Sequence, residues 1–336
     1  MHFHHTPSLL VLLLTMNHFS ICGQQDSVPV PCPPGQFTAK IFTNFHKGIT
    51  RADRFSAFEV QRAYLGYQHY LNKNFSAEIK LNIGNPLGTP ENTIINRYAY
   101  FKNAAFYYAT ERVYFKFGII DIDLLDMQED FWNHRYIAKS FMDEYRFGDK
   151  ADLGAGFRYR IMNGVSADIA IMNGEGYKNI QNDNAFRTGI GITVSPIKDL
   201  TLRVYSDFIE KNEKQLTLVT FISYHIGPAS AAFEYNHKMN RDFFLNHDQN
   251  GISAYVSWQL NDKFELFGRY DVLSSNIHVP VDRPWNYLND GSAIISGVQY
   301  EITDGLKASV NYQDWNPYEA TLDRRSYLYL NFEIIL

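Results

Sequence analysis

Residues 121–150 combine acidic and basic side chains in one polar stretch. Eight are acidic and four are basic: Asp121, Asp123, Asp126, Glu129, Asp130, Asp143, Glu144 and Asp149, against Arg135, Lys139, Arg146 and Lys150. The side chains expected to face a passage are Glu129, Asp130, Arg135, Lys139, Asp143 and Glu144. Charges that line a narrow passage select ions through their field rather than by making bonds. This segment therefore predicts ion selection rather than catalysis.

A second set of charges lies at alternating positions of extended segments, where every other side chain points to one face. The candidates for a basic wall are Arg62, Lys80, Arg112, Lys116, Arg158, Arg160 and Arg203. An acidic segment opposite a basic wall would create a field across the passage. The strands on either side of residues 121–150 carry Arg112, Lys116, Arg158 and Arg160, which we expect to line the constriction and to favour anions weakly. For any one of these residues, the simpler alternative is a solvated position on the polar face.

Catalytic and metal-binding patterns are missing from the sequence. There is no HExxH motif and no pair of cysteine ligands, so we expect no metal, no cofactor and no catalytic residue. Loop oxygens in 121–123 and 182–184 could bind calcium, but solvated acids are the simpler interpretation. His69, His225 and His237 lie in no serine or aspartate motif. An outer-membrane hydrolase remains a weaker alternative, since it needs a nucleophile and a base within reach.

The elements that must position these charges are strands, because the period is two nearly everywhere after residue 36. In FSAEIKLNI, residues 75–83, apolar side chains alternate strictly with polar ones. The pattern predicts about sixteen strands, an even number as bacterial outer-membrane barrels require. They are expected at 36–46, 57–71, 75–84, 94–108, 112–120, 151–161, 165–173, 185–195, 199–210, 214–226, 229–237, 251–260, 263–274, 291–302, 305–315 and 325–336.

Short and long connections alternate between these strands, which is the rhythm of a transmembrane antiparallel β-barrel. We therefore expect an all-β fold in which residues 36–336 form the barrel and strand 36–46 runs outward. The third external connection is then 121–150, and we expect it to fold into the pore. Met127, Phe131, Ile137 and Phe141 recur at roughly helical spacing and predict a helix in its middle.

The final strand, SYLYLNFEIIL, alternates up to Leu336. It would close the cylinder against strand 36–46 and leave no edge in lipid. Terminal strands of such barrels often end in an aromatic residue that the barrel-assembly machinery reads, whereas here Phe332 lies four residues before the end.

The N-terminal residues predict export. SLLVLLLTM, residues 8–16, has the length of the apolar region of a signal peptide, and small Gly23 suits the residue before the cut. We expect a signal peptide over 1–23 and a proline-rich periplasmic lead-in over 24–35. A lipidated Cys22 is the alternative. If Cys22 leaves with the signal, Cys32 remains alone and no disulfide forms within the chain.

The segments FEVQRAYLG (58–66) and FSAEIKLNIG (75–84) resemble the phosphate-selective porin O and P family, with matches at Arg62, Ala63 and Gly66. AYFKNAAFYY and VYFKFGIID resemble the next two strands of that family. Gln61 stands where an arginine is common. The resemblance implies an outer-membrane porin for passive diffusion of small hydrophilic solutes or ions, weakly selective for anions such as phosphate. It also implies a homotrimer embedded in outer-membrane lipid of a Gram-negative bacterium.

The net charge of −5 shows no basic excess of the kind that nucleic-acid binding needs. A secreted, soluble β-rich protein that binds glycans is a further alternative, because aromatic residues gather in 278–288 and 312–318 and could stack on sugars. The same aromatic residues also suit external loops or the girdles of a barrel.

Overall fold

The computed structural model describes residues 35–50, 53–84, 98–276 and 290–336. The expected signal peptide, nearly all of the lead-in 24–35 and the aromatic segment 278–288 lie outside the described residues. Among the described residues, no helix is long and apolar enough to cross a membrane.

Sixteen strands make up the described part of the fold. They are β1 Gly35–Gly48, β2 Ser56–Tyr70, β3 Phe75–Gly84, β4 Tyr98–Ala109, β5 Val113–Asp121, β6 Ala151–Met162, β7 Val165–Met172, β8 Arg187–Val194, β9 Leu200–Glu210, β10 Lys214–Ile226, β11 Ala229–Met239, β12 Gln249–Gln259, β13 Phe264–Ser275, β14 Gly291–Thr303, β15 Leu306–Pro317 and β16 Arg325–Ile335. Between them lie α1 Asp123–Trp132, α2 Phe141–Glu144 and the short 3-10 helix η1 Arg241–Phe243.

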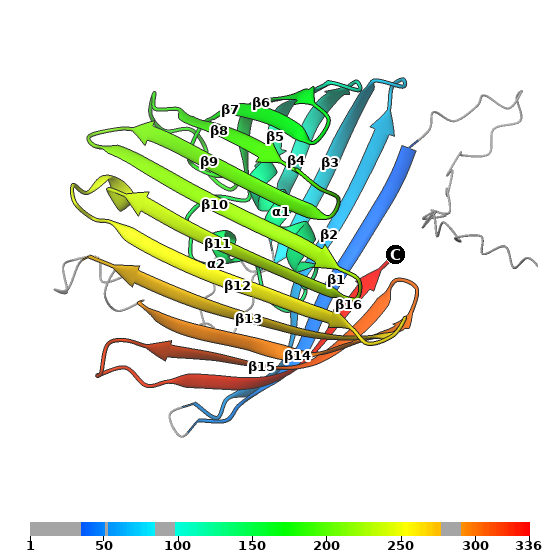
Figure 1. The fold of residues 1–336 in the computed structure, drawn as a ribbon, viewed down its shortest axis with the longest axis vertical. Helices are drawn as coiled ribbons and strands as arrows, with labels where there is room; N and C mark the ends of the chain where they lie inside the picture. The colour runs from blue at the N-terminus through cyan, green and yellow to red at the C-terminus, as the bar shows by residue number, and fades with distance from the viewer. Residues whose placement is uncertain (1–34, 51–52, 85–97, 277–289) are drawn as a thin grey trace, which may run out of the picture.

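The strands form one closed antiparallel barrel in which each pairs with its neighbours in the sequence (Figure 1). The ring closes between β1 and β16, with Lys40 opposite Ile335 and Gly48 opposite Tyr327. The backbone N–H of Leu336 donates to the carbonyl of Ala39 at 2.9 Å. The expected sixteen-stranded barrel and the closing pair are both confirmed.

The two faces of the wall differ as the alternation requires. Along β9, Arg203, Tyr205 and Asp207 point inward and are almost completely buried. Leu202, Val204 and Phe208 point outward and are 37%, 59% and 38% exposed. An outward apolar face opposite a polar interior is the pattern of a barrel in lipid.

The two ends of the barrel differ in the length of their connections. At one end, which we call the short-turn end, neighbouring strands are joined by tight turns. Gly164, Gly227 and Gly305 in these turns have φ values of 74°, 56° and 75°, which glycine adopts without strain. The opposite end, the long-connection end, carries the segments between β5 and β6, β7 and β8, and β11 and β12.

The segment between β5 and β6, residues 122–150, lies inside the barrel with α1 and α2, and we call it the inner loop (Figure 1). A helix in this segment was expected, but not the observed division into two. Asn133 has a left-handed φ of 51° and ends α1 at Trp132. The expected shared face of Met127, Phe131, Ile137 and Phe141 is therefore wrong. The buried residues of α1 are Leu124, Leu125, Gln128 and Trp132.

Gly118 permits the close approach of β5 to β4 just before the inner loop. Its φ is 122°, and a Cβ atom there would stand 2.2 Å from the carbonyl oxygen of Ala104. We expect Gly118→Ala to destabilise the barrel by about 1–3 kcal/mol, because the backbone would have to shift. The measurement is the temperature at which the folded band is lost on unboiled SDS gels.

The matched control is Gly84→Ala, where a Cβ would meet ordinary contacts at 3.5 Å and beyond. If both variants lost the folded band at the same temperature, the close approach at Gly118 would make no measurable contribution to stability.

Candidate pore-lining site

Hydrogen bonds fasten the inner loop to the far wall of the barrel. The hydroxyl of Tyr136 donates to Gln299 on β14 at 2.9 Å, and the hydroxyl of Tyr145 donates to Asp271 on β13 at 3.2 Å. The backbone N–H of Phe141 donates to the Tyr255 hydroxyl on β12 at 3.1 Å. Further bonds join Gln128 to Glu234, Arg269 to the Lys139 carbonyl and Asn331 to the Tyr136 carbonyl. The expected inward fold of this loop thus agrees with the contacts in the structure.

Trp132 is the aromatic anchor of the inner loop. Its ring lies 5.5 Å from Tyr255 and 6.0 Å from Phe267, both on the inner wall. The guanidinium of Arg269 lies 5.6 Å from the Trp132 ring centre. Since Trp132 is 3% exposed, apolar burial as well as hydrogen bonding holds the loop inside the lumen.

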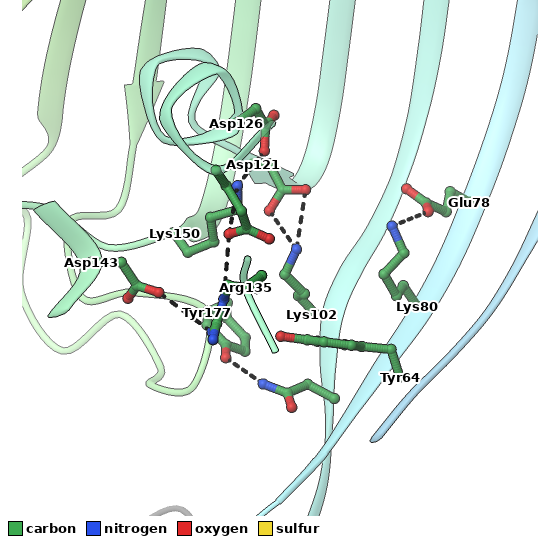
Figure 2. A network of polar contacts seen from close by, with 12 residues as sticks. Tyr64, Glu78, Lys80, Lys102, Asp121, Asp126, Arg135, Asp143, Lys150 and Tyr177 are labelled. Carbon is green, nitrogen blue, oxygen red and sulfur yellow. Dashed lines mark hydrogen bonds and ion pairs between the residues drawn. The ribbon is translucent and has the colours of Figure 1, made fainter. Parts of the chain in front are cut away.

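The opposite side of the inner loop lies among ion pairs of the near wall and of the loop itself, and Figure 2 shows two of them, Lys102 with Asp121 at the end of β5 and Lys150 with Asp126 within the loop. Lys102 on β4 pairs with Asp121 at 3.2 Å, and Lys116 on β5 pairs with Asp123 at 2.5 Å. Lys150 pairs with Asp126 at 2.6 Å. A charge buried in this way needs such a partner, because burial alone disfavours the ionised form.

Two carboxyl groups of the inner loop are shifted in opposite directions. Burial would raise the pKa of Glu129, but Lys150 and Arg135 outweigh it and hold the pKa below its usual value. Burial and the neighbouring Asp121 raise the pKa of Asp126 to about 6, although Lys150 opposes the shift. Asp126 also borders two cavities at the short-turn end. It is therefore a group that titrates near neutral pH and faces the lumen.

The charges that were expected to face a passage mostly pair within the loop itself. Arg135 lies 3.5 Å from Glu129 and 3.6 Å from Asp143, and Lys139 lies 3.7 Å from Asp143. Asp130 and Glu144 remain exposed. The loop is thus less acidic toward the lumen than its composition indicated.

Two irregularities in strand pairing add inward polar residues that alternation does not predict. The register between β3 and β4 shifts between Lys80 and Leu81, and both Lys102 and Asn103 are buried there, 8% and 0% exposed. A shift between β1 and β2 similarly places Gln61 and Arg62 on the same cavity. An extra residue in one strand of a pair lets consecutive side chains face the same side.

Five of the seven expected wall residues face the lumen, but they are not equivalent. Lys80 pairs with Glu78 at 2.7 Å, and Arg203 is fixed to Asp168 by hydrogen bonds of 2.7 and 2.8 Å. Lys116 and Arg158 both meet Asp123 of the inner loop, at 2.5 and 3.4 Å. Arg62 forms no ion pair with a described residue and lines a cavity of about 730 Å³.

Arg112 and Arg160 are not brought to the inner loop. Arg112 lies exposed in the turn between β4 and β5, and its carbonyl accepts a hydrogen bond from the N–H of Arg160 at 2.8 Å. Arg160 is also exposed, near the short-turn end of β6. This corrects their expected place at the constriction: the strands are long enough to carry both residues well away from the loop.

The inner loop lies between cavities of opposite charge. A cavity of about 730 Å³ at the long-connection end, the outer cavity, is lined by more bases than acids, including Arg62, Lys139, Arg146 and Arg241. A cavity of about 400 Å³ at the short-turn end, the inner cavity, is lined by Asp123, Asp126 and Asp130 with Arg158. A second one of about 350 Å³ is lined by Glu78, Asp121 and Asp126 with Lys116. The charges that line the cavities therefore differ along the barrel axis, a separation that the sequence did not predict, and the expected field across the passage stays a prediction.

Several outer-membrane proteins of solved structure have the same fold, while no family model and no curated protein matches the sequence. An anion-selective porin from Comamonas acidovorans has a TM-score of 0.67 at 11% identity, covering 90% of this chain and 99% of that one. OprB of Pseudomonas putida has a TM-score of 0.67 at 12% identity, with 90% and 94% covered. A trimer form of OmpT, an outer membrane protein of Vibrio cholerae, has a TM-score of 0.63 at 12% identity, with 90% and 99% covered. At these identities the likeness shows the fold.

Removing the aromatic anchor should release the inner loop without opening the barrel. Truncating a buried tryptophan costs about 3–5 kcal/mol, and here the loss falls on the loop rather than on the strand ladder. We expect Trp132→Ala to speed tryptic cleavage within residues 135–146 by at least about tenfold. Mass spectrometry of the folded protein after timed digestion gives the rate.

The matched control is Trp258→Ala on the outward face, where the side chain is 51% exposed. Unchanged cleavage in Trp132→Ala would mean that the tryptophan does not hold the loop.

Asp126 should make ion preference depend on pH. Its raised pKa means that the folded chain binds this proton more tightly than the unfolded chain does. Its contribution to stability therefore falls as pH rises from the ordinary carboxyl range through about 6. Protonation also removes negative charge from the inner cavity, so preference for anions should rise as pH falls through about 6.

Reversal potentials recorded between pH 5 and 8, values chosen about one to two units around that pKa, measure this effect. Asp126→Asn should flatten the profile, and Asp262→Asn in an exposed turn should leave it as in the parent protein. If the reversal potential of Asp126→Asn still changed with pH around 6, the titration would belong to another group.

Proposed function

We propose that this protein is an outer-membrane porin through which small hydrophilic solutes and ions diffuse passively. The observation that carries the proposal is the closed barrel with an apolar outer face, a polar lumen and an inner loop that separates two hollow regions. Closed barrels leave no unpaired backbone groups in lipid. Similarity of fold to outer-membrane porins supports the same interpretation.

In this proposal the protein sits in the outer membrane of a Gram-negative bacterium, with the long-connection end outside. Residues 1–23 would direct export and be removed, and the barrel-assembly machinery would insert the folded strands. A homotrimer fits the resemblance of the sequence and the trimer form found for the Vibrio cholerae protein.

We infer a weak preference for anions from the outer cavity, through which external solutes would enter. Two of its three acids are occupied: Asp271 accepts hydrogen bonds from Arg269 at 2.8 and 2.7 Å, and Asp314 pairs with Arg324, whereas Glu144 is exposed. Its bases are less fully paired, because Arg62 and Arg146 form no ion pair with any described residue. Uncompensated positive charge at the mouth of a pore raises the local concentration of anions.

Phosphate belongs among these anions on the strength of the sequence resemblance, and Arg62 is the residue that the resemblance and the cavity share. Gln61, which replaces a common arginine of that family, lines the same cavity. A neutral amide at this position lowers the positive charge, so a weak preference is expected rather than strict phosphate selection.

Catalysis has little support in the described part of the chain. Many of the lumen carboxylates are engaged by lysine, arginine, amide or tyrosine partners rather than by a nucleophile and a base. Glu234, for example, receives hydrogen bonds from Gln128, Asn236 and Tyr255. This arrangement suits a wall that holds a loop in place.

Planar-bilayer recording of the refolded protein across a KCl gradient tests the proposal. We expect stepwise conductance and a reversal potential that favours chloride. Absence of steps from protein shown to be folded would contradict a porin. A reversal potential that favours potassium would support the porin function and contradict the preference for anions.

Arg62→Gln should shift the reversal potential toward potassium, because it removes a charge that no described partner compensates. Lys73→Gln, in an exposed turn at the opposite end, is the matched control with the same loss of charge. Equal potentials for the two variants would exclude Arg62 from ion selection.

A further inference from the structure

The outer cavity has a second chemical character that ion selection does not use. Besides its bases, it is lined by Trp315 and Tyr145, whose ring centres are 5.9 Å apart with an angle of 35° between planes. Phe42, Leu273 and Ile295 add apolar atoms to the same lining. A lumen that served only hydrated ions would need no such surface, since barrel interiors are ordinarily polar.

The aromatic pair is held in place, with Tyr145 on the inner loop and Trp315 on the barrel wall. The Tyr145 hydroxyl donates to Asp271, which is itself fixed by Arg269 and by the hydroxyl of Ser253 at 2.6 Å. Trp315 lies on β15 at a position paired with Ala293 and Arg325. Both rings therefore have fixed positions from which to contact a planar ligand.

Cations line the same cavity, at positions other than those of the two rings. Arg62 comes from β2 and Lys139 from the inner loop. Lys178, on the connection between β7 and β8, is close enough that burial and then Arg62 and Lys139 lower its pKa. Like charges gathered in this way repel one another, and an anion placed among them relieves that repulsion.

We propose that the outer cavity is a binding site for small organic anions that carry an aromatic ring. The carboxylate would lie near Arg62 and Lys139, and the ring would stack on Trp315 and Tyr145. The volume of about 730 Å³ is within the range of small-ligand pockets. The inference rests on the proposed porin function, and it names the class of solute that the porin would retain during passage.

Block of KCl current by added solutes tests the site. The probes are benzoate, acetate as the same charge without a ring, and benzamide as the same ring without a charge. A solute that binds inside the lumen interrupts the ion current. We expect benzoate to halve the conductance at a concentration at least about tenfold lower than acetate or benzamide does, since charge and ring contribute together.

Two variants separate the two contributions. Trp315→Ala should raise the half-blocking concentration of benzoate about fivefold or more and leave that of acetate unchanged. Arg62→Gln should raise the half-blocking concentrations of benzoate and acetate by a similar factor. Trp258→Ala, on the outward face, is the aromatic control. Each solute should block its current at the same concentration as in the parent protein.

The outcomes are distinct. Equal block by acetate and benzoate would overturn the role of the ring, and equal block by benzamide and benzoate would overturn the role of the charge. Steady KCl steps with no block by benzoate would overturn the site while leaving the porin intact. Absence of KCl steps would instead contradict the proposed function itself.

Discussion

A sheet placed in lipid can leave no backbone group without a partner, and every other feature of this structure depends on that constraint. The ladder between β1 and β16 satisfies it, because it joins the first and last strands into a ring. Once the ring is closed, alternation decides which side chains face lipid and which face the lumen, except where the strand register shifts. The chemistry of the protein is then confined to one enclosed face.

The inner loop turns this enclosed space into two regions. Its far side is held by hydrogen bonds and by the packing of Trp132, and its near side by ion pairs of Asp123 with Lys116 and Arg158. The acids of its first helix border the inner cavity, whereas Lys139 and Arg146 border the outer one. A single loop thus separates positive from negative charge along the axis, and in the proposed orientation a solute that enters from outside meets the positive region first.

The sequence was sufficient for the barrel, because a period of two holds in nearly every strand and short turns alternate with long connections. It was not sufficient for Lys102, since a local shift of register turns both Lys102 and Asn103 inward against the alternation. Nor could it locate Arg112 and Arg160. Both residues are close to the inner loop in sequence, but they lie at the far ends of the strands that flank it. The axial separation of charge depends on the path of the loop, which tertiary contacts at Tyr136 and Tyr145 determine.

Sided labelling of single cysteines tests the division of the lumen most directly. Lys139→Cys and Asp130→Cys, each in a Cys32→Ser background, would be exposed in intact cells to a maleimide carried on a polymer too large to pass a pore. Lys139 borders the outer cavity and Asp130 the inner one. We expect the cysteine at 139 to react from outside and the cysteine at 130 to react only in disrupted cells. Equal reaction of both from outside would contradict a loop that divides the lumen.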